Sequence, residues 1–161
     1  MRPNRRQFIA GSLAIGGSPA LAGPLATLQA NTTPQTINVR GRAICLTEEL
    51  EKLYQVVADC DDRGHVYAIR TATGETFPLL PVDSAAAIWL DARYRERELN
   101  VVARIFPGGR HLEVVKYQSW KNGQLHDLDY FCEVCMISTH KPGPCDCCQD
   151  PVVFRERPVA P

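Results

Sequence analysis

The sequence predicts a mainly β protein, a small antiparallel barrel or sandwich with one or two short helices and a cysteine-rich C-terminal extension. Five or six short stretches rich in β-branched and aromatic residues alternate with turns that contain Gly, Pro or Asn. Only two stretches show a helical spacing of apolar residues. Five of the seven cysteines lie within residues 132–148, close to the end of the chain.

The first 22 residues have the layout of a cleavable signal peptide. A basic start is followed by an apolar run and then by small residues that end at Ala22. Arg5 and Arg6, followed by Gln7 and Phe8, resemble the twin-arginine (Tat) export signal. This resemblance implies that the protein is exported already folded and that it is periplasmic or otherwise extracytoplasmic.

We therefore expect four parts: a Tat-type signal at 1–22, a flexible leader at 23–35, a β domain at 36–131 and a cysteine-rich, metal-binding tail at 132–161. Removal of the signal leaves 15 basic against 18 acidic residues, a net charge of −3. This charge argues against nucleic acid as a partner. We expect a protein or small-molecule partner of unknown identity and no membrane span in the mature chain.

The first half of the β domain predicts three strands and a helix. Residues 36–46 favour a long first strand with a glycine near a bend. Residues 47–58 begin with a threonine and two glutamates and space their apolar residues as an amphipathic helix does. Two short strands follow within residues 65–81, around the turn Thr73-Gly74.

The second half of the β domain predicts a short helical segment and two hairpins. Asp83 or Ser84 is the expected N-cap of the short helical segment at 85–94. Residues 99–120 predict a hairpin that turns at Pro107-Gly108-Gly109. The next turn, Asn122-Gly123, is the strongest short hairpin signal in the chain.

This order of elements resembles an OB-fold barrel over residues 36–131. OB folds bind single-stranded nucleic acid through a basic groove with stacking aromatic residues. The corresponding cluster in this chain consists of Arg93, Arg95, Arg97 and Arg104 with Trp89, Tyr94 and Trp120. Acidic residues interleave with these arginines, so we interpret the cluster as a solvated charged surface.

Two C-x2-C pairs near the C-terminus predict a metal site. Cys132 and Cys135 form the first pair, and Cys145 and Cys148 form the second. Each short turn aims two sulfurs at a common centre, so two turns can supply the four corners of a tetrahedron. The intervening Lys-Pro-Gly-Pro segment favours a tight reversal between them. The paired turns resemble the knuckles of zinc ribbons and rubredoxin-like domains.

The expected cofactor is one Zn²⁺, with iron or a [2Fe–2S] cluster as the alternative, because thiolates bind all three. Cys147 and His140 are possible additional or alternative ligands, and Cys147 could replace Cys148 in the second pair. Disulfides are another possible use of these sulfurs in an exported protein. A thioredoxin-type redox pair fits less well, because Cys132 follows a predicted strand.

The other two cysteines, Cys45 and Cys60, are candidates for a structural disulfide or for two separate buried thiols. His65, His111 and His126 show no ligand spacing. The chain contains none of the familiar short catalytic motifs. We therefore expect an exported, non-catalytic binding or interaction domain with a structural metal; the alternative is an extracytoplasmic redox or electron-transfer protein that uses iron or a reactive thiol in the cysteine cluster.

Overall fold

The computed structural model describes residues 32–56 and 64–160, and within these ranges the protein is mainly β, as predicted. The strands are β1 (Gln35–Cys45), β2 (Tyr67–Arg70), β3 (Thr76–Pro78), β4 (Glu98–Ile105), β5 (Leu112–Lys121), β6 (Gln124–Cys132), β7 (Ile137–Thr139) and β8 (Val153–Pro158). The helices are α1 (Leu46–Tyr54), α2 (Ala87–Leu90) and α3 (Ala92–Arg95), with a 3-10 turn, η1, at Asp83–Ala85. The predicted signal peptide and Cys60 lie outside the described residues.

The strands form one antiparallel sheet in the order β3-β2-β1-β4-β5-β6-β7, with β8 paired to β6. The sheet is not closed, so the predicted barrel is only a loose description of it. Among the described residues, an isolated bridge between Leu79 and Leu112 joins the end of β3 to the start of β5. The first five strands therefore curve around a core without forming a continuous ladder.

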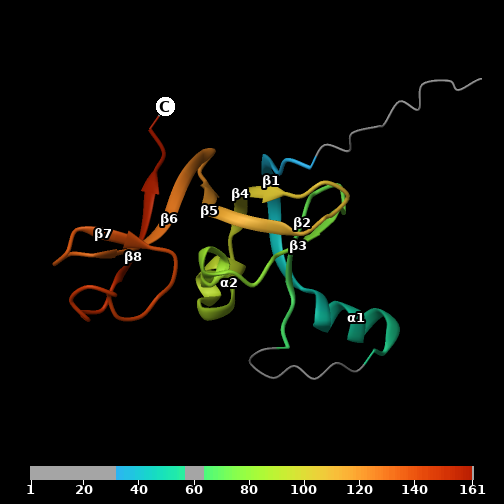
Figure 1. Cartoon of the computed structure of the whole chain (residues 1–161). Coiled ribbons are helices and arrows are strands. Elements are labelled where there is room, and N and C mark those ends of the chain that lie inside the picture. Colours follow the sequence, from blue (N-terminus) through green and yellow to red (C-terminus); the bar gives the residue numbers. More distant parts are fainter. Residues whose placement is uncertain (1–31, 57–63, 161) are drawn as a thin grey trace, which may run out of the picture.

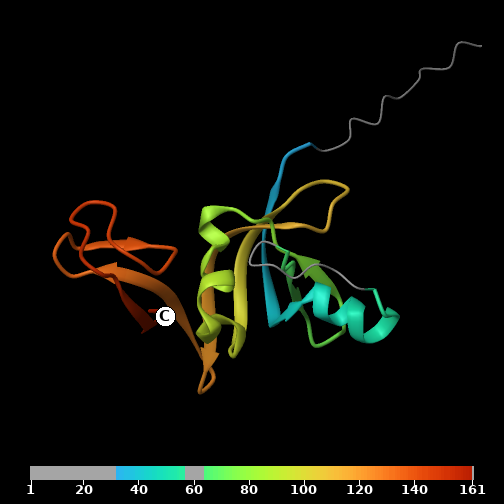
Figure 2. The ribbon, with the colours of Figure 1, turned by 90° about the horizontal axis from the view of Figure 1, so that it is seen from below.

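Strand β6 carries the chain out of the main sheet. Residues 126–128 pair with both β5 and β8, so these two strands lie on opposite edges of β6. Beyond Leu128, β7 replaces β5 on its edge. The far half of β6 thus forms a lobe with β7 and β8, and Figures 1 and 2 show this lobe beside the short helices and far from α1.

Glycine is required where β1 changes partners. The first part of β1 pairs with β4, and the part from Arg42 onward pairs with β2. A Cβ atom on Gly41 would lie only 2.2 Å from the carbonyl oxygen of Arg70. The expected glycine bend is therefore a place where the backbone of β2 lies against β1.

The hairpin turns match their sequence signals. Asn122 and Gly123 have φ angles of 53° and 77°, and this pair of left-handed residues is what a two-residue hairpin turn needs. The cap prediction, in contrast, was wrong: η1 and α2 have no side-chain cap. Asp91 instead caps α3 by accepting a hydrogen bond from the backbone N–H of Arg93 at 2.9 Å. Ser84 donates its hydroxyl to the carbonyl of Val114.

The core lies between the curved sheet and the η1–α3 segment. Its aromatic part is a cluster in which Tyr94 packs against Tyr117, Tyr130 and Phe154, with ring centroids 5.2–6.1 Å apart. The hydroxyl of Tyr130 donates to the buried carboxylate of Asp91 at 2.5 Å. The η1–α3 segment and the far end of β6 are thereby joined in one core.

The C-terminal tail contributes two strands, β7 and β8, that the sequence did not predict. Strand β8 is short, and its sequence contains Arg155, Glu156 and Arg157, so it resembles an exposed loop. Pairing of β8 with β6 brings the charged side chains of β8 close to hydrogen-bonding partners. Arg155 and Arg157 bond Asp129 of β6, and Glu156 accepts a hydrogen bond from Ser119 of β5.

The amphipathic helix α1 is present, but its apolar side chains are not buried among the described residues. Leu53 is 65% exposed and Tyr54 is 69% exposed. Only Thr47 of this helix is buried. Contacts at its first residues attach α1 to the sheet: the N–H of Leu46 donates to the carbonyl of Val66, and Thr47 bonds Gly64 and Val66.

Candidate metal centre

The two C-x2-C turns lie at the ends of two hairpin-like segments. The first turn joins β6 to β7, whose last pair is Cys132 and Ile137. The second follows Pro144, which forms an isolated bridge with Pro151. Within that segment the N–H of Cys145 donates to the carbonyl of Asp150 at 2.7 Å. Each pair of cysteines is thus held by backbone hydrogen bonds on both sides.

The turns have the same backbone hydrogen bond. The residue four positions after the first cysteine donates its N–H to the carbonyl of that cysteine: Met136 to Cys132, and Gln149 to Cys145, both at 2.9 Å. Both donors have positive φ angles, 57° and 65°. Glycine commonly occupies such left-handed positions, but neither pair of cysteines is followed by a glycine.

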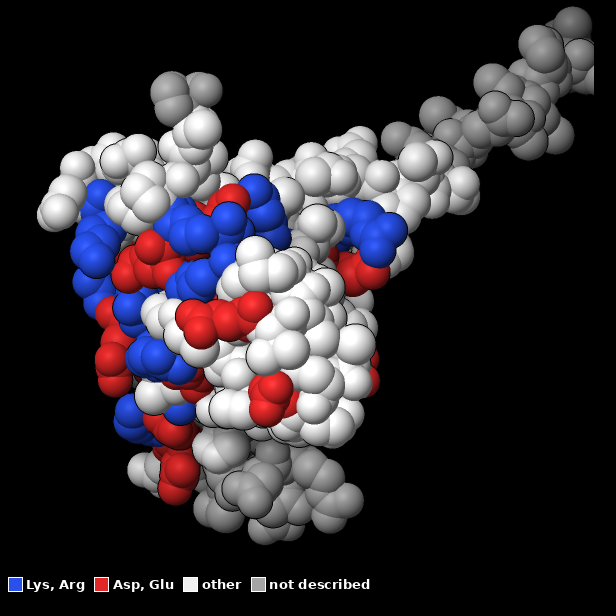
Figure 3. Space-filling view, turned by 90° about the vertical axis from the view of Figure 1, so that its left-hand side faces the viewer, with Lys and Arg blue, Asp and Glu red and all other residues white. Residues whose placement is uncertain are grey.

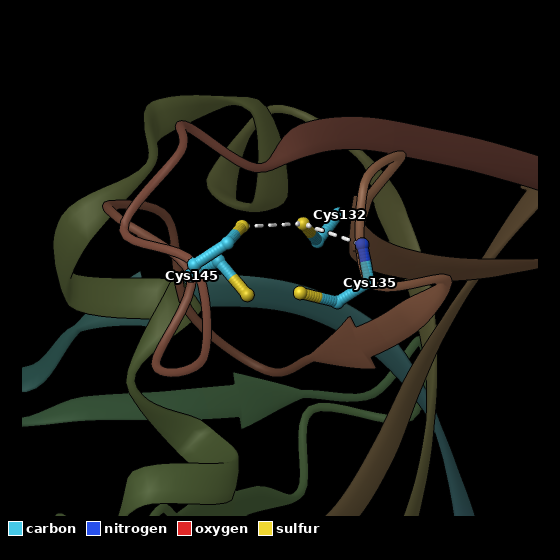
Figure 4. Close-up of side chains that lie close together, drawn as sticks. Cys132, Cys135 and Cys145 are labelled. Carbon is cyan, nitrogen blue, oxygen red and sulfur yellow. Dashed lines mark hydrogen bonds between the residues drawn. The ribbon is translucent and has the colours of Figure 1, made fainter.

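The structure brings Cys132, Cys135, Cys145 and Cys148 together. Their four sulfur atoms all lie within 4.8 Å of one another, and Cys132 Sγ is 3.4 Å from Cys148 Sγ. Figure 4 shows the labelled side chains pointing toward one another from the two turns. Four thiolates around a tetrahedral zinc at about 2.3 Å would be about 3.8 Å apart. The cluster therefore needs only small side-chain adjustments to hold such an ion.

Backbone N–H groups point at the sulfurs of both turns. The N–H of Cys135 lies 3.4 Å from Cys132 Sγ, and the N–H of Cys147 lies 3.4 Å from Cys145 Sγ. Hydrogen bonds from the backbone of Cys148 and Cys147 lower the pKa of Cys145 to about 7. Metal ligands must be thiolates, so donors of this kind favour the ligating form.

The first cysteine of each turn is buried, and the second is partly exposed. Cys147 is exposed and is not a member of the four-sulfur group. Its thiol nevertheless lies near enough to Cys135 to raise the pKa of that thiol, and Cys148 raises the same pKa. His140 is exposed and also lies outside the group. The geometry therefore favours the two-residue spacing in both pairs.

The arginines of the basic stretch are engaged within the protein. Their partners are Asp91 for Arg93, the carbonyl of Ile88 for Arg95, Glu156 for Arg97 and Glu113 for Arg104. Of the three nearby aromatic residues, Tyr94 is buried and cannot stack on a base. The side of the molecule that carries the β7–β8 lobe shows cationic and anionic groups intermixed beside an uncharged area (Figure 3). These contacts favour our interpretation of the stretch as a charged surface.

The fold and this site define a mainly antiparallel β protein with a cysteine cluster that could bind a metal ion. The chain matches no protein-family model, and neither the curated proteins nor the solved structures give a significant match. None of the helices within residues 32–56 and 64–160 has the length and apolar character that a membrane span requires. Any statement on function therefore depends on the geometry of the site.

Proposed function

We propose that the protein is an exported, non-catalytic binding or interaction domain in which Cys132, Cys135, Cys145 and Cys148 hold one structural Zn²⁺. The observation that carries this proposal is the convergence of four sulfurs within 4.8 Å from two turns with the same hydrogen bonding. Four protein ligands leave no coordination position for substrate or activated water. An ion held in this way would stabilise the β7–β8 lobe, whose four ligands lie on two separate loops.

An exported protein with an OB-like sheet would present its curved strands to a partner. The resemblance to OB folds is one of strand order, and the bridge between Leu79 and Leu112 is consistent with it. The mature charge and the engaged arginines argue for a protein or small-molecule partner over nucleic acid. Salt-sensitive micromolar binding to a single-stranded oligonucleotide would contradict this part of the proposal.

Single replacement of the five clustered cysteines by serine tests the metal site. We expect one zinc ion per chain in the wild type, and loss of the metal with a lower Tm in the variants of Cys132, Cys135, Cys145 and Cys148. Cys147→Ser is the matched control and should keep its metal, because Cys147 lies outside the four-sulfur group. Elemental analysis and thermal unfolding give the two measurements. A metal-free native protein whose cluster thiols are all oxidised would contradict the metal site and indicate disulfides in its place.

A redox role is the second candidate, and the exposed thiol of Cys147 beside Cys135 favours it. In that case the four-cysteine site would hold iron, or Cys147 would react with an external thiol or oxidant. The colour of protein purified from its native compartment distinguishes the candidates, because zinc-thiolate is colourless and iron-thiolate absorbs visible light. A coloured protein with iron and no zinc would favour electron transfer.

Export by the Tat route is the third part of the proposal, and it rests on Arg5-Arg6 in the sequence. Changing both arginines to lysine should leave unprocessed precursor in the cytoplasm, while changing Arg2 alone to lysine should not. The measurement is cell fractionation followed by N-terminal sequencing, with cleavage expected after Ala22. Normal export of the double variant would exclude the Tat route without affecting the metal proposal.

A further inference from the structure

A second group of metal-ligating side chains lies at the start of α1, a helix far from the lobe that carries the cysteine cluster (Figure 1). The sulfur of Cys45, a carboxylate oxygen of Glu48 and a ring nitrogen of His65 all lie within 4.8 Å of one another. The closest approach is 3.2 Å, between Cys45 Sγ and His65 Nδ1. The sequence showed no ligand spacing for His65, because twenty residues separate it from Cys45.

Three different elements of the fold place these side chains. Cys45 is the last residue of β1 and the residue before α1, and Glu48 follows three positions later, on the same face of the helix. His65 comes from the segment before β2. Hydrogen bonds hold that segment against the start of α1: Leu46 donates to Val66, and Thr47 donates to the carbonyl of Gly64.

The backbone and ring of His65 are also held from the other side. The indole N–H of Trp89, in α2, donates to the carbonyl of His65 at 2.8 Å. The imidazole stacks on Tyr67 with ring centroids 6.0 Å apart. These two contacts position the backbone and the ring of His65 beside Cys45.

The donor set and its spacing suit a divalent transition metal. A thiolate and a carboxylate together carry a charge of about −2, which balances a divalent cation, and imidazole is a good ligand for the same ions. Tetrahedral zinc with ordinary Zn–S and Zn–N bonds places its sulfur and nitrogen about 3.6 Å apart. The 3.2 Å separation of Cys45 and His65 is close to this value.

Three protein ligands leave one tetrahedral position open, and there is space beside it. Cys45 and Glu48 line a surface pocket of about 310 Å³, together with Tyr67 and Arg95. Sites with three protein ligands and a free position hold water or an exchangeable ligand, in contrast to closed four-cysteine sites. The two clusters in this protein therefore differ in the chemistry that they can support.

We propose that Cys45, Glu48 and His65 form a second metal site, selective for Zn²⁺ or a similar transition-metal ion and open to one small ligand from the adjacent pocket. This inference goes beyond the proposed structural zinc and does not depend on it. The site also gives Cys45 a role different from a disulfide with Cys60. A thiolate that binds metal cannot at the same time form that bond.

The test is Co²⁺ binding by the full mature chain, because bound cobalt absorbs visible light and its ligands change the spectrum. Wild-type protein should bind one more Co²⁺ per chain than Glu48→Gln or His65→Gln protein. Each substitution should weaken binding at this site at least about tenfold, since even loss of an indirect contact to a ligand costs that much. Glu51→Gln, an exposed glutamate of the same helix, is the matched control and should bind as the wild type does.

Both substitutions spare the core, because Glu48 is exposed and His65 is only partly buried. Circular dichroism should therefore show folded protein in each case. Binding by Cys132→Ser protein separates the two proposals, since this variant should keep the Cys45 site even if the four-cysteine site is lost. Equal stoichiometry in wild type, Glu48→Gln and His65→Gln would overturn the inference. So would mass spectrometry of the native protein that finds Cys45 joined to Cys60.

Discussion

Met136 and Gln149 occupy equivalent places in the two cysteine turns. Each is the fourth residue after the first cysteine of its pair, and each donates its N–H to the carbonyl of that cysteine at 2.9 Å. Each has a left-handed backbone, with φ of 57° and 65°. Two turns of different sequence have therefore reached the same conformation, and in both a residue with a side chain holds a position that favours glycine.

Replacing Met136 or Gln149 by glycine should stabilise the protein. The left-handed conformation costs an ordinary residue about 1–2 kcal/mol, and glycine recovers part of this at the expense of chain entropy. Met136 is 71% exposed, so little packing is lost. We expect a gain of about 0.5–1 kcal/mol for each substitution, measured by chemical unfolding of the metal-loaded protein.

Glu133→Gly is the matched control for these substitutions. Glu133 lies in the same turn as Met136, is exposed and is not among the residues with positive φ. Glycine there gains no conformational relief and should destabilise the protein by about 0.5–1 kcal/mol. The same sign for Met136→Gly and Glu133→Gly would contradict the strain argument.

Gly41→Ala should be strongly destabilising. The added Cβ would lie 2.2 Å from the carbonyl oxygen of Arg70, and neither backbone can move without breaking the pairing of β1 and β2. We expect a loss of about 3 kcal/mol or more in unfolding free energy. Gly109→Ala is the control, because its Cβ would lie at an ordinary 3.5 Å from the carbonyl oxygen of Phe106. A change below about 0.5 kcal/mol is expected there.

Asp91 should make stability depend on pH. Hydrogen bonds from Arg93, together with the hydroxyl of Tyr130, lower the pKa of this carboxyl from 3.8 to about 2. A group whose pKa falls on folding stabilises the native state above its unfolded pKa and loses that effect as pH falls through the folded value. The shift corresponds to roughly 2 kcal/mol at pH 7 and to about half of that at pH 3.

The measurement is the difference in unfolding free energy between wild type and Asp91→Asn. Both proteins contain the same cysteine cluster, so acid release of a metal affects them equally and cancels in the difference. We expect the difference to shrink by about 1 kcal/mol between pH 7 and pH 3. A difference that stays constant over this range would show that the charge of Asp91 contributes nothing beyond its hydrogen bonds.

Phe154→Ala should weaken the attachment of the C-terminal lobe. Phe154 packs edge-on against Tyr94 and Tyr130 and carries the guanidinium of Arg93 at 4.1 Å from its ring centroid. Loss of a ring that is only partly buried should cost about 2–3 kcal/mol. Val153→Ala, a 49% exposed neighbour in β8, should cost less than about 1 kcal/mol. Similar losses at the two positions would mean that strand pairing, and not the aromatic cluster, holds the tail.

Local chemistry made several elements predictable from the sequence. A two-residue Asn-Gly turn requires two left-handed residues, and this requirement is met within the turn itself at Asn122 and Gly123. The two-residue gap within each cysteine pair acts in the same local way, so the sequence could indicate that Cys132 and Cys135 face one centre. The helix after the first strand was predictable from its first turn and the spacing of its leucines.

Capping was not predictable in this way, since Asp83, Ser84 and Asp91 are all capable of capping a helix. Asp91 caps α3, and the same carboxylate accepts a hydrogen bond from Tyr130, thirty-nine residues later in the chain. Similarly, the charged residues of β8 resemble those of an exposed loop in the sequence, whereas in the structure Arg155 and Arg157 bind Asp129 of β6. In both cases a partner of these side chains lies far away along the chain.

The sequence by itself determined the mainly β class, the hairpin turns and the concentration of thiols at the C-terminal end, because each depends on residues close together in the chain. The spacing of the cysteines also predicted that the two turns share one centre and that Cys147 lies outside it, and the structure brings these four sulfurs together. Only the tertiary structure decided that the sheet stays open, which strands carry the two turns to one place, and that His65 lies beside Cys45. These relationships depend on where β6 stops pairing with β5 and begins to pair with β7, and on which segment packs against the start of α1. Packing between distant segments sets both, and no local spacing of residues encodes them.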